Sequence, residues 1–405
     1  MNPCLLFVDD DPNILNGLRR TLMAQRKVWD MHFVESGSAA LSLLADQNVD
    51  VVVSDMRMPG MDGAELLCRV RELYPHIMRI ILSGYADEET VARAVPVAHQ
   101  YLTKPCEAAQ LVAAINNVLI VRQNIGDKRL AGLLAGMNSL PGLPQSLRAV
   151  LQELEKPEPS IKMLGQLISR DVALSANLLR VVNSSFYGFA RRVSAPEQAV
   201  SLLGFRVVRS LALSVHLFTA LTSDQQAGFS LQGLWDHCLR VSGLAQSIAR
   251  AEGLPVEVCE QATVAGLLHD VGKLVASVLL PTEYGEVLRL ARDEGVRLVE
   301  AEKRLLGFTH AEVGCFLMGL WGVAVPVTQA LAHHHAPSGR ENALGAVTVV
   351  HVANVLEHRA VVYNAQYALP ELDKEHLQVL GVADNVSRWE ELAANLSAEG
   401  NHAAS

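Results

Sequence analysis

The first residues whose types could do chemistry are polar side chains that follow short apolar runs near the start of the chain. Asp9 and Asp10 follow CLLFV, Asp55 follows VDVVVS, Ser83 follows IMRIIL and Lys104 follows QYLT. Three carboxylates in one pocket repel one another unless a hard cation is bound, and oxygen ligands suit Mg²⁺. With the ion bound, Asp55 could attack a phosphoryl group, while the other polar groups neutralise charge on its oxygens.

The second group consists of histidines around the adjacent pair His269 and Asp270, in the stretch GLLHDVGKL. Two adjacent helical residues project about 100° apart and could both lean toward one ion, with His237 as a third ligand. Such ligands suit Mn, Fe, Co or Zn, which could activate water against a phosphoester. The alternative interpretation is a buried His–Asp hydrogen bond that only fixes helix packing. The remaining histidines of this region are His216, His310, His333, His334, His335, His351 and His358.

The elements that must position the first group alternate between short apolar runs and amphipathic segments. This alternation predicts five β–α units, and therefore a doubly wound α/β fold with a parallel sheet. Functional residues of such sheets gather at the carboxyl ends of the strands. The predicted strands are 4–8, 31–34, 49–54, 77–82 and 100–102, and the predicted helices are 12–26, 38–46, 63–73, 88–94 and 108–121.

The elements that carry the histidines have helical periodicity, and strand-like alternation is scarce after residue 145. The pattern predicts an all-α domain. We expect domains at 1–122 and 139–360, a helical linker at 123–138, and C-terminal helices with a disordered tail at 361–405. The predicted helices are 161–183, 196–203, 206–221, 231–251, 256–268, 283–294, 311–320, 326–335 and 343–358, then 373–380 and 386–398.

Composition narrows the functional classes. The chain has 34 Lys and Arg against 43 Asp and Glu, and a net charge of −9 disfavours binding to nucleic acid. Arg206 and Arg209 are the only hint of a DNA-binding face, and two arginines on an amphipathic helix are usually solvated. Six cysteines without a C-x-x-C pair indicate a reducing cytoplasm. We see no signal peptide and no clean membrane span.

Four separate motifs in the first domain resemble the receiver domain of two-component response regulators. They are FVDDDPNIL, VVVSDMRMPGMDG, RIILSGYAD and YLTKP, each at the end of its expected strand. The resemblance implies that Asp55 is the phosphoacceptor and that a sensor histidine kinase is the partner. It also implies that Asp10, Asp55 and the main-chain carbonyl of Arg57 bind Mg²⁺, with Asp9 supporting the ion. Ser83 and Lys104 would contact the phosphoryl group, and Tyr101 would be the aromatic switch.

The second region is similar to the HDOD family, the HD-related output domains derived from metal-dependent phosphohydrolases. The resemblance rests on segments between 139 and 354, among them LPGLPQSL, LISRDVALSANLLRVVNSSFYG, AGLLHDVGKL and VVHVAN. It implies that His237, His269 and Asp270 match three residues of the hydrolase metal site. Asn354 stands where hydrolases place the last carboxylate, and a neutral amide weakens binding of a divalent ion. Glu357, one helical turn later, is an alternative carboxylate on spacing alone.

These features predict a cytoplasmic response regulator that a histidine kinase phosphorylates on Asp55. Its HDOD region would pass the signal to an unknown downstream protein partner without hydrolysing a substrate, and a homodimer is left open. The alternative is a receiver-gated, metal-dependent phosphohydrolase acting on cyclic dinucleotides or nucleotides. The incomplete set of acids, with Asn354 as its last member, favours the first hypothesis.

Overall fold

The computed structural model describes most of the chain, and the chain divides into two compact units that are treated separately below. The units are formed mainly by residues 1–142 and by residues 143–405. The predicted helix at 88–94, and all but the first two residues of the predicted linker at 123–138, lie outside the described residues. The structure describes residues 2–74, 76–83, 98, 100–104, 106, 108–124, 145–154, 156–182, 193–220, 230–320, 323–361 and 368–402.

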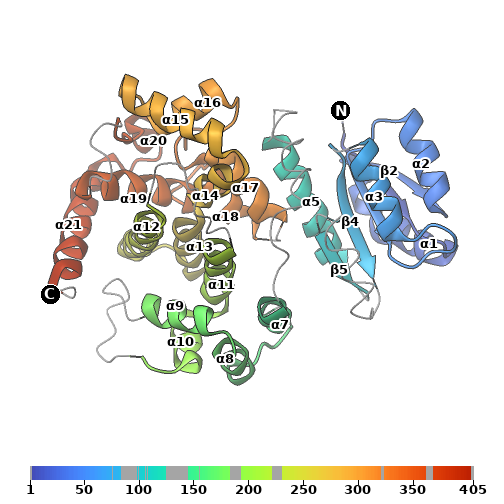
Figure 1. Cartoon of the computed structure of the whole chain (residues 1–405), viewed down its shortest axis with the longest axis horizontal. Coiled ribbons are helices and arrows are strands. Elements are labelled where there is room, and N and C mark those ends of the chain that lie inside the picture. The colour runs from blue at the N-terminus through green and yellow to red at the C-terminus, as the bar shows by residue number, and fades with distance from the viewer. Residues whose placement is uncertain are drawn as a thin grey trace. The chain divides into compact units, whose positions relative to one another are not determined.

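The first unit is built on a parallel sheet whose described strands lie in the order β2-β1-β3-β4-β5 (Figure 1). Every described pair of neighbours is parallel, with Leu5 opposite Val51 and Ser54 opposite Ile81. The sequence-based prediction of a doubly wound α/β fold is therefore confirmed. The strands are β1 (Cys4–Val8), β2 (Asp30–Val34), β3 (Val51–Asp55), β4 (Met78–Ser83) and β5 (Gln100–Thr103).

Three helices of this unit begin at side chains that cap their free N–H groups. Asp11 precedes Pro12 and accepts a hydrogen bond from the N–H of Asn13 at 2.8 Å. Such caps suit the first turn of a helix, and proline is favoured at its first position. The predicted helix at 12–26 ends at Thr21 and continues as a 3₁₀ helix. The helices are α1 (Pro12–Thr21), η1 (Met23–Lys27), α2 (Gly37–Asp46), α3 (Gly63–Leu73) and α5 (Ala108–Asn124).

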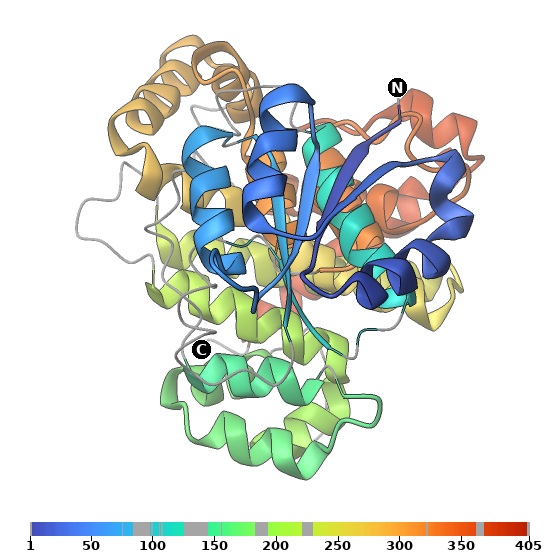
Figure 2. The ribbon, with the colours of Figure 1, turned by 90° about the vertical axis from the view of Figure 1, so that its right-hand side faces the viewer.

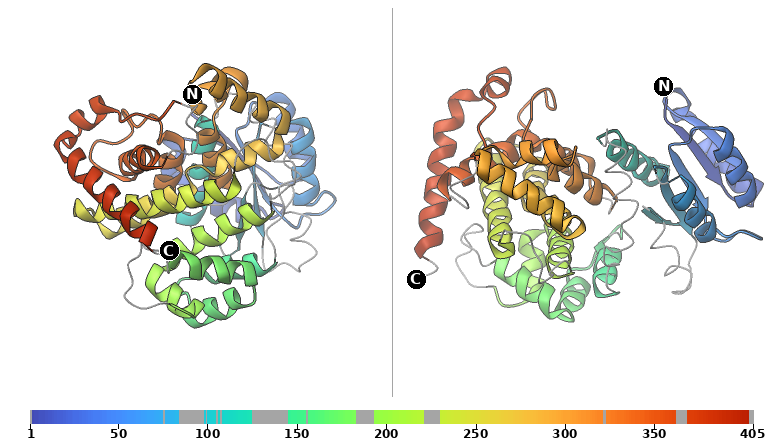
Figure 3. Two further views of the ribbon diagram at one scale, coloured as in Figure 1. Left: turned by 60° about the vertical axis from the view of Figure 1, so that its left-hand side comes forward. Right: turned by 45° about the horizontal axis from the view of Figure 1, so that its top comes forward.

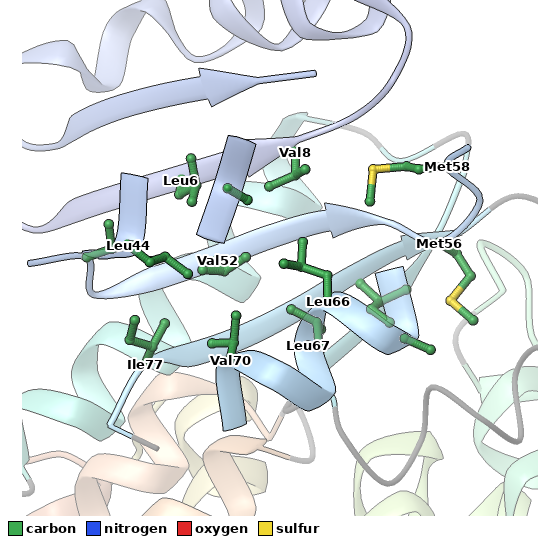
Figure 4. Close-up of a cluster of buried hydrophobic side chains, with 14 residues drawn as sticks. Leu6, Val8, Leu44, Val52, Met56, Met58, Leu66, Leu67, Val70 and Ile77 are labelled. Atoms are coloured by element: carbon green, nitrogen blue, oxygen red, sulfur yellow. The ribbon is translucent and has the colours of Figure 1, made fainter. Parts of the chain in front are cut away.

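The core of the first unit lies between the sheet and helices α2 and α3, as Figure 4 shows. Leu6, Val8 and Val52 come from the strands, and Leu44 and Leu67 come from the helices. The intervening strand residues, such as Phe7 and Val53, are equally buried. Strands buried on both faces are typical of parallel sheets covered by helices. The sheet is therefore a rigid support for residues at its carboxyl edge.

The second unit is helical, and no strand occurs among its described residues (Figures 1 and 3). The prediction of an all-α domain is confirmed. Its helices are α7 (Gln145–Leu154), α8 (Ile161–Ser169), α9 (Val172–Val182), α10 (Pro196–Leu203), α11 (Phe205–Ala220), α12 (Leu231–Ala251), α13 (Val256–Leu268), α14 (Val271–Leu279), α15 (Pro281–Glu294), α16 (Leu298–Leu305), α17 (His310–Leu320), α18 (Val325–His333), α19 (Ala346–Ala360), α20 (Lys374–Val379) and α21 (Val386–His402), with a 3₁₀ turn η2 (Ala383–Asn385).

Some helix boundaries differ from the sequence-based prediction. The segment 161–183 was predicted as one helix but forms α8 and α9. Asp171 lies between them, and its side chain accepts a hydrogen bond from the N–H of Leu174 at 3.0 Å. Such a side chain offers the backbone a new helix start. Helices α7, α14 and α16 were not predicted, and α21 continues to His402, beyond its predicted end at 398.

The centre of the second unit is formed by α12, α13 and α19, which pack against one another. Gly266 permits a close approach of α13 to α12, since a Cβ atom there would lie 2.8 Å from the Cα of Ser242. On the outer side, α21 packs on α12 and α19, as the left view of Figure 3 shows. Its Trp389 is fully buried and donates a hydrogen bond to Glu252 at 2.6 Å.

One continuous helical stretch in the described residues is long and apolar enough to cross a membrane. It is the stretch Val256–Leu279, and 83% of its most apolar 18 residues are buried inside the protein. A second candidate, α10 with α11, is bent by 119° at its break. The core helices of a globular domain pass the same test, and Figure 2 shows both stretches within the helical unit.

Candidate functional site

The predicted receiver residues lie at the carboxyl edge of the parallel sheet. Asp9 follows β1 and Asp55 ends β3, and these two strands are neighbours. Asp9 is 2% exposed and Asp55 is 9% exposed, whereas Asp10 is exposed. The fold thus brings two of the three predicted carboxylates into a buried position, with the third at the surface beside them.

Lys104, which follows β5, joins these two carboxylates. Its Nζ lies 2.7 Å from Oδ2 of Asp9 and also forms an ion pair with Oδ1 of Asp55. Burial lowers the pKa of Lys104, but its hydrogen bonds and ion pairs with Asp55 and Asp9 outweigh burial and raise the pKa above its ordinary value. The ammonium is therefore a fixed positive charge beside the Asp55 carboxylate.

The second oxygen of Asp55 is held by the main chain. Its Oδ2 accepts a hydrogen bond from the N–H of Arg57 at 2.6 Å. Gly63 begins α3 directly against this strand end, where a Cβ atom would lie 2.1 Å from the carbonyl oxygen of Asp55. Only a glycine permits such an approach. The second glycine of the motif MPGMDG therefore lets α3 pack directly against the end of β3 at Asp55.

The remaining predicted receiver residues are placed only by their backbone. Ser83 ends β4 opposite Thr103, and Tyr101 lies in β5 opposite Ile81. The side chains of Ser83 and Tyr101 lie outside the described part of the structure. The Mg²⁺ role of Asp10 and of the Arg57 carbonyl stays a prediction. An edge of carboxylate and carbonyl oxygens is nevertheless a donor set that fits Mg²⁺.

The second predicted site lies where α13 and α14 meet. His269 follows the last residue of α13, and Asp270 immediately precedes α14. The pair therefore occupies a helix junction, and the predicted helix 256–268 ends directly before it, as α13 does. His237 comes from the middle of α12. His237 is 3% exposed, and the other two side chains are 0% and 1% exposed.

His237, His269 and Asp270 together are called the first ligand group below. The Nε2 atoms of His237 and His269 are 3.1 Å apart. Oδ2 of Asp270 lies 3.3 Å from the former and 3.4 Å from the latter. All three atoms lie within 4.8 Å of one another, as one divalent ion would require.

Asp270 also belongs to a second ligand group with His310, His334 and His335, whose ligand atoms again lie within 4.8 Å of one another. Oδ1 of Asp270 is 3.2 Å from Nε2 of His310 and 3.8 Å from Nε2 of His334. The Nε2 atoms of His335 and His310 are 3.0 Å apart. One carboxylate therefore offers each of its oxygens to a different set of imidazoles.

In four of these histidines Nδ1 forms a hydrogen bond with an acceptor of the protein, so that Nε2 is the nitrogen that faces the other ligand atoms. An Nδ1 that donates leaves Nε2 as an acceptor in the neutral ring. Acceptors that face one another repel, whereas a metal ion between them would satisfy all of them. The pairs are His237 with Oε2 of Glu357 (2.5 Å), His269 with the Gly266 carbonyl (2.8 Å), His310 with Oε2 of Glu302 (2.7 Å) and His334 with the Leu331 carbonyl (2.7 Å).

Two buried atoms of the second ligand group have no hydrogen-bond partner within the described structure. They are Oδ1 of Asp270 and Nε2 of His334. Buried polar atoms without a partner are rare and call for an explanation. A divalent metal ion with mixed nitrogen and oxygen ligands fits these atoms, and it would be held by the two ligand groups.

The charges of the cluster follow from burial and from its ion pairs. Burial raises the pKa of Asp270, but His269 and Lys273 outweigh it and hold the pKa well below its usual value. Lys273 contributes an ion pair at 2.6 Å. Burial and the neighbouring imidazoles hold the pKa of His334 and of His335 well below the ordinary value. These two rings are therefore neutral ligands at neutral pH.

Asn354 and Glu357 have different surroundings on α19. Asn354 is 1% exposed, and its amide oxygen has no hydrogen-bond partner in the described structure. Glu357 instead accepts hydrogen bonds from Nδ1 of His237 and from Nε of Arg240 at 2.7 Å. Glu357 thus orients the imidazole of His237 through Nδ1, as carboxylates do for metal-bound histidines. It does not take the position of the missing acid.

A pocket with a volume of about 270 Å³ lies beside the two ligand groups. Its polar end includes His237, Asp270, His310 and His335. Lys273 and His358 line it as well, and burial lowers the pKa of His358 to about 3. A small molecule in this pocket would therefore reach the cluster directly.

Comparisons with known proteins agree with the division of the chain into two units. Residues 5–116 match the response regulator receiver domain, and residues 140–337 match the HDOD domain. The chain is a receiver–HDOD protein. The receiver match includes Asp9, Asp55 and Lys104, and the HDOD match includes both ligand groups. Glu357 lies beyond the HDOD match, although it contacts a ligand within it.

Individual relatives match different shares of the chain. The hydrogenase transcriptional regulatory protein HoxA of Cupriavidus necator is 38% identical over 125 residues, which are 30% of this chain and 25% of that protein. An uncharacterized protein of Treponema pallidum is 25% identical over 280 residues, 69% of this chain and 52% of that protein. The chain thus spans about half or less of the length of these relatives.

The solved structure of an HDOD domain protein of unknown function from Geobacter sulfurreducens has the fold of the second unit. It is 24% identical and has a TM-score of 0.52, and the match covers 67% of this chain and 93% of that protein. At this identity the likeness establishes the fold of the HDOD domain and no activity.

Sequence reasoning missed part of the HDOD site. His310, His334 and His335 were recognised as histidines near the pair, but no spacing assigned them to it. Glu302, which holds His310 through two hydrogen bonds at 2.9 and 2.7 Å, was not singled out. A triple histidine that follows a helical pattern was the one available signal, since such runs are often metal ligands.

Proposed function

We propose that this receiver–HDOD protein is a two-component response regulator, phosphorylated on Asp55 by a sensor histidine kinase. The observation that carries the proposal is the Lys104 ammonium, which joins the buried carboxylates of Asp55 and Asp9 at the carboxyl edge of the sheet. Asp55 is thereby presented as a carboxylate nucleophile in a buried position with a cation beside it.

The phosphoryl group would pass from a histidine nitrogen of the kinase to an Asp55 oxygen, as the phosphorus–nitrogen bond breaks and the phosphorus–oxygen bond forms. Mg²⁺ held by Asp10, Asp55 and the Arg57 carbonyl, with Asp9 in support, would neutralise charge on the transferring oxygens. Lys104 contributes its fixed charge, and the Arg57 N–H holds the other Asp55 oxygen. Ser83 and Tyr101 would sense the phosphoryl group.

The HDOD domain would act as the output, by changing its contacts with a downstream protein partner in the cytoplasm. Phosphorylation can shift the output only as far as the two output states differ in their interaction with the receiver. Relatives named as transcriptional regulators share the receiver region of this chain, and they carry the comparison no further than that domain.

Phosphoryl incorporation from a small-molecule phosphodonor tests this proposal. We expect the full-length chain to incorporate label in the presence of Mg²⁺ and Asp55→Asn to incorporate none. Asp46→Asn is the matched control, because Asp46 is an exposed aspartate at the end of α2. Labelling of Asp55→Asn at the level of Asp46→Asn would exclude Asp55 as the acceptor.

A second candidate function is a metal-dependent phosphohydrolase in the HDOD domain. The observation that favours it is the pair of ligand groups that share Asp270 beside the pocket. A divalent metal there would supply an activated water and a Lewis acid. The chain itself would bind the substrate in the pocket, hold His237 and His310 through Glu357 and Glu302, and keep Lys273 beside Asp270.

Metal analysis combined with a turnover assay on a panel of nucleotides and cyclic dinucleotides tests the second candidate. The hydrolase hypothesis predicts stoichiometric metal and turnover, and His269→Ala should lose both. His32→Ala is the control, since His32 lies in β2 of the receiver. Metal without turnover would support an output domain that keeps the ion for structure, and absence of both would exclude the hydrolase.

A further inference from the structure

The lining of the pocket beside the two ligand groups is of two kinds. Part of it presents imidazoles, the Asp270 carboxylate and the Lys273 ammonium. Another part, which we call the aliphatic wall, comes from three helices and the segment before α20. Its residues are Leu234 of α12, Leu288 of α15, Leu298 and Val299 of α16, and Leu369 with Pro370.

The aliphatic wall runs from the interior to the surface. Leu234 and Leu288 are 8% and 5% exposed. Leu298 and Val299 are half-buried, and Leu369 is 40% exposed. A ligand that contacts the whole wall would thus have an apolar part leading outward from the cluster, and its burial would be favourable in proportion to its apolar area.

Two polar side chains that line the pocket have partners within the protein. The Tyr284 hydroxyl donates to Glu302 at 2.9 Å, and the Ser230 hydroxyl accepts a hydrogen bond from the Gly233 N–H at 3.1 Å. A nucleobase or a ribose needs hydrogen-bond partners along its edges, and its hydroxyls lose affinity where they are buried without them. The described wall therefore suits a hydrocarbon better than a nucleoside.

The charged end suits one anionic group. Lys273 is the single lysine or arginine among the described residues that line the pocket, and its ammonium is paired with Asp270. A divalent ion in the ligand groups would add positive charge at the same end. The aliphatic wall carries no lysine or arginine for a second phosphate, and a volume of about 270 Å³ is small for a cyclic dinucleotide.

We infer that the pocket binds a single-chain aliphatic phosphoester, with its phosphate at the ligand groups and its alkyl chain against Leu298, Leu288 and Leu234. This inference rests on the second candidate function and names its substrate class. Hydrolysis would break the phosphorus–oxygen bond by addition of water and release the aliphatic alcohol and phosphate.

Calorimetric binding of alkylphosphonates to the Mn²⁺-loaded full-length chain tests the inference, because their carbon–phosphorus bond resists hydrolysis. We expect hexylphosphonate to bind on the order of 1,000-fold more tightly than methylphosphonate, since each of its five additional methylenes contributes about fourfold when it is buried on the wall. Leu298→Asn should remove most of this difference by weakening the binding of hexylphosphonate. Leu305→Asn is the matched control, because Leu305 lies on the same helix, is 41% exposed and does not line the pocket.

The outcomes separate this inference from the function on which it rests. A chain that binds no Mn²⁺ would overturn both, and this is seen before any ligand is added. A chain that binds Mn²⁺ but gives equal affinities along the phosphonate series would overturn the inference alone. A cyclic dinucleotide that binds more tightly than hexylphosphonate, or hexanoate that binds equally well, would also overturn it.

Discussion

The histidines of the two ligand groups are distinguished by the acceptors that hold their Nδ1 atoms. Glu357 and Glu302 hold the Nδ1 atoms of His237 and His310, and main-chain carbonyls hold those of His269 and His334. A histidine that serves only to fix helix packing has no need to turn its Nε2 toward other imidazoles and a shared carboxylate. The pattern of partners therefore favours the metal hypothesis over the interpretation as a packing hydrogen bond.

Replacing Glu357 by Gln tests this interpretation at a single residue. The neutral amide would leave His237 less basic, and we expect metal affinity to fall by about 10–100-fold. Competition with a chromogenic chelator measures it on the full-length chain. Glu390→Gln is the control, since Glu390 on α21 forms an exposed ion pair with Arg359. Equal affinities of the two variants would contradict an orienting role for Glu357.

The protonation of His237 and His310 predicts how metal affinity depends on pH. Burial lowers the pKa of each, but Asp270 and Glu357 raise that of His237, and Glu302 and Asp270 raise that of His310, so both lie above the ordinary value. Metal must displace these protons, and affinity should therefore rise with pH and level off above the raised pKa values. Calorimetry in two buffers of different ionisation enthalpy would show the released protons. A pH-independent affinity without proton release would contradict the prediction.

Among the elements, the close packing of α14 on α17 decides where Asp270 meets His310. A Cβ atom on Gly272 would lie 1.9 Å from the carbonyl oxygen of His310. No side chain can be accommodated there unless one of the helices moves. The glycine in HDVGKL therefore has a structural reason, which is independent of any role in binding a substrate.

Substituting Gly272 by Ala should separate the two helices. We expect a loss of about 1–3 kcal/mol in the free energy of unfolding of the HDOD domain, together with weaker metal binding. Gly17→Ala in α1 is the matched control, because no atom lies within 4 Å of the added methyl group. It should stabilise the receiver by about 0.5–1 kcal/mol. Urea unfolding measures both, and a Gly272→Ala variant as stable as the unsubstituted chain would refute the proposed contact.

Prediction of elements succeeded where one local pattern determined the structure. Strands β1 and β3 are apolar runs followed or ended by the acids Asp9 and Asp55, and the sheet brings the ends of neighbouring strands together. The break at Asp171 was missed because the apolar periodicity continues across it, and a capping side chain competes with that periodicity only locally. Helix α14 was missed because its residues are apolar on nearly every side.

At the scale of the whole molecule, the two units hold their candidate sites separately. Both ligand groups and the pocket belong to the second unit, and Asp9, Asp55 and Lys104 belong to the first. A fragment that starts at residue 139 should therefore keep the metal site. We expect scanning calorimetry of the full-length chain to show two transitions.

A divalent metal should raise the midpoint temperature of the HDOD transition and leave that of the receiver unchanged. At a metal concentration of 100 times the dissociation constant, the free energy of unfolding of the HDOD domain should increase by about 2.7 kcal/mol. The fragment from 139 to 405 should show the same increase, and a chelator should reverse it in both. If the fragment failed to bind metal, the site would require the receiver. If metal shifted the receiver transition as well, the two domains would be coupled in the unphosphorylated chain.

Prediction of the candidate sites differed between the units for a physical reason. The receiver site could be predicted because a parallel sheet converts sequence order into spatial order at one edge. The HDOD cluster draws on α12, α13, α17 and α18, and the packing of helices does not follow from the spacing of histidines along the chain. Asn354 marked a missing acid, but only the structure showed that Glu357 acts behind His237.

The shared carboxylate of Asp270 has a consequence for how the cluster would fill. Each of its oxygens faces a different ligand group, and so the two positions are not independent sites. An ion in one ligand group would bind the same Asp270 carboxylate that is a ligand of the other group. By thermodynamic reciprocity, each ion would then change the affinity of the other ion by the same factor. A metal titration would then report a coupled pair of steps, whose constants belong to the cluster and to neither position alone.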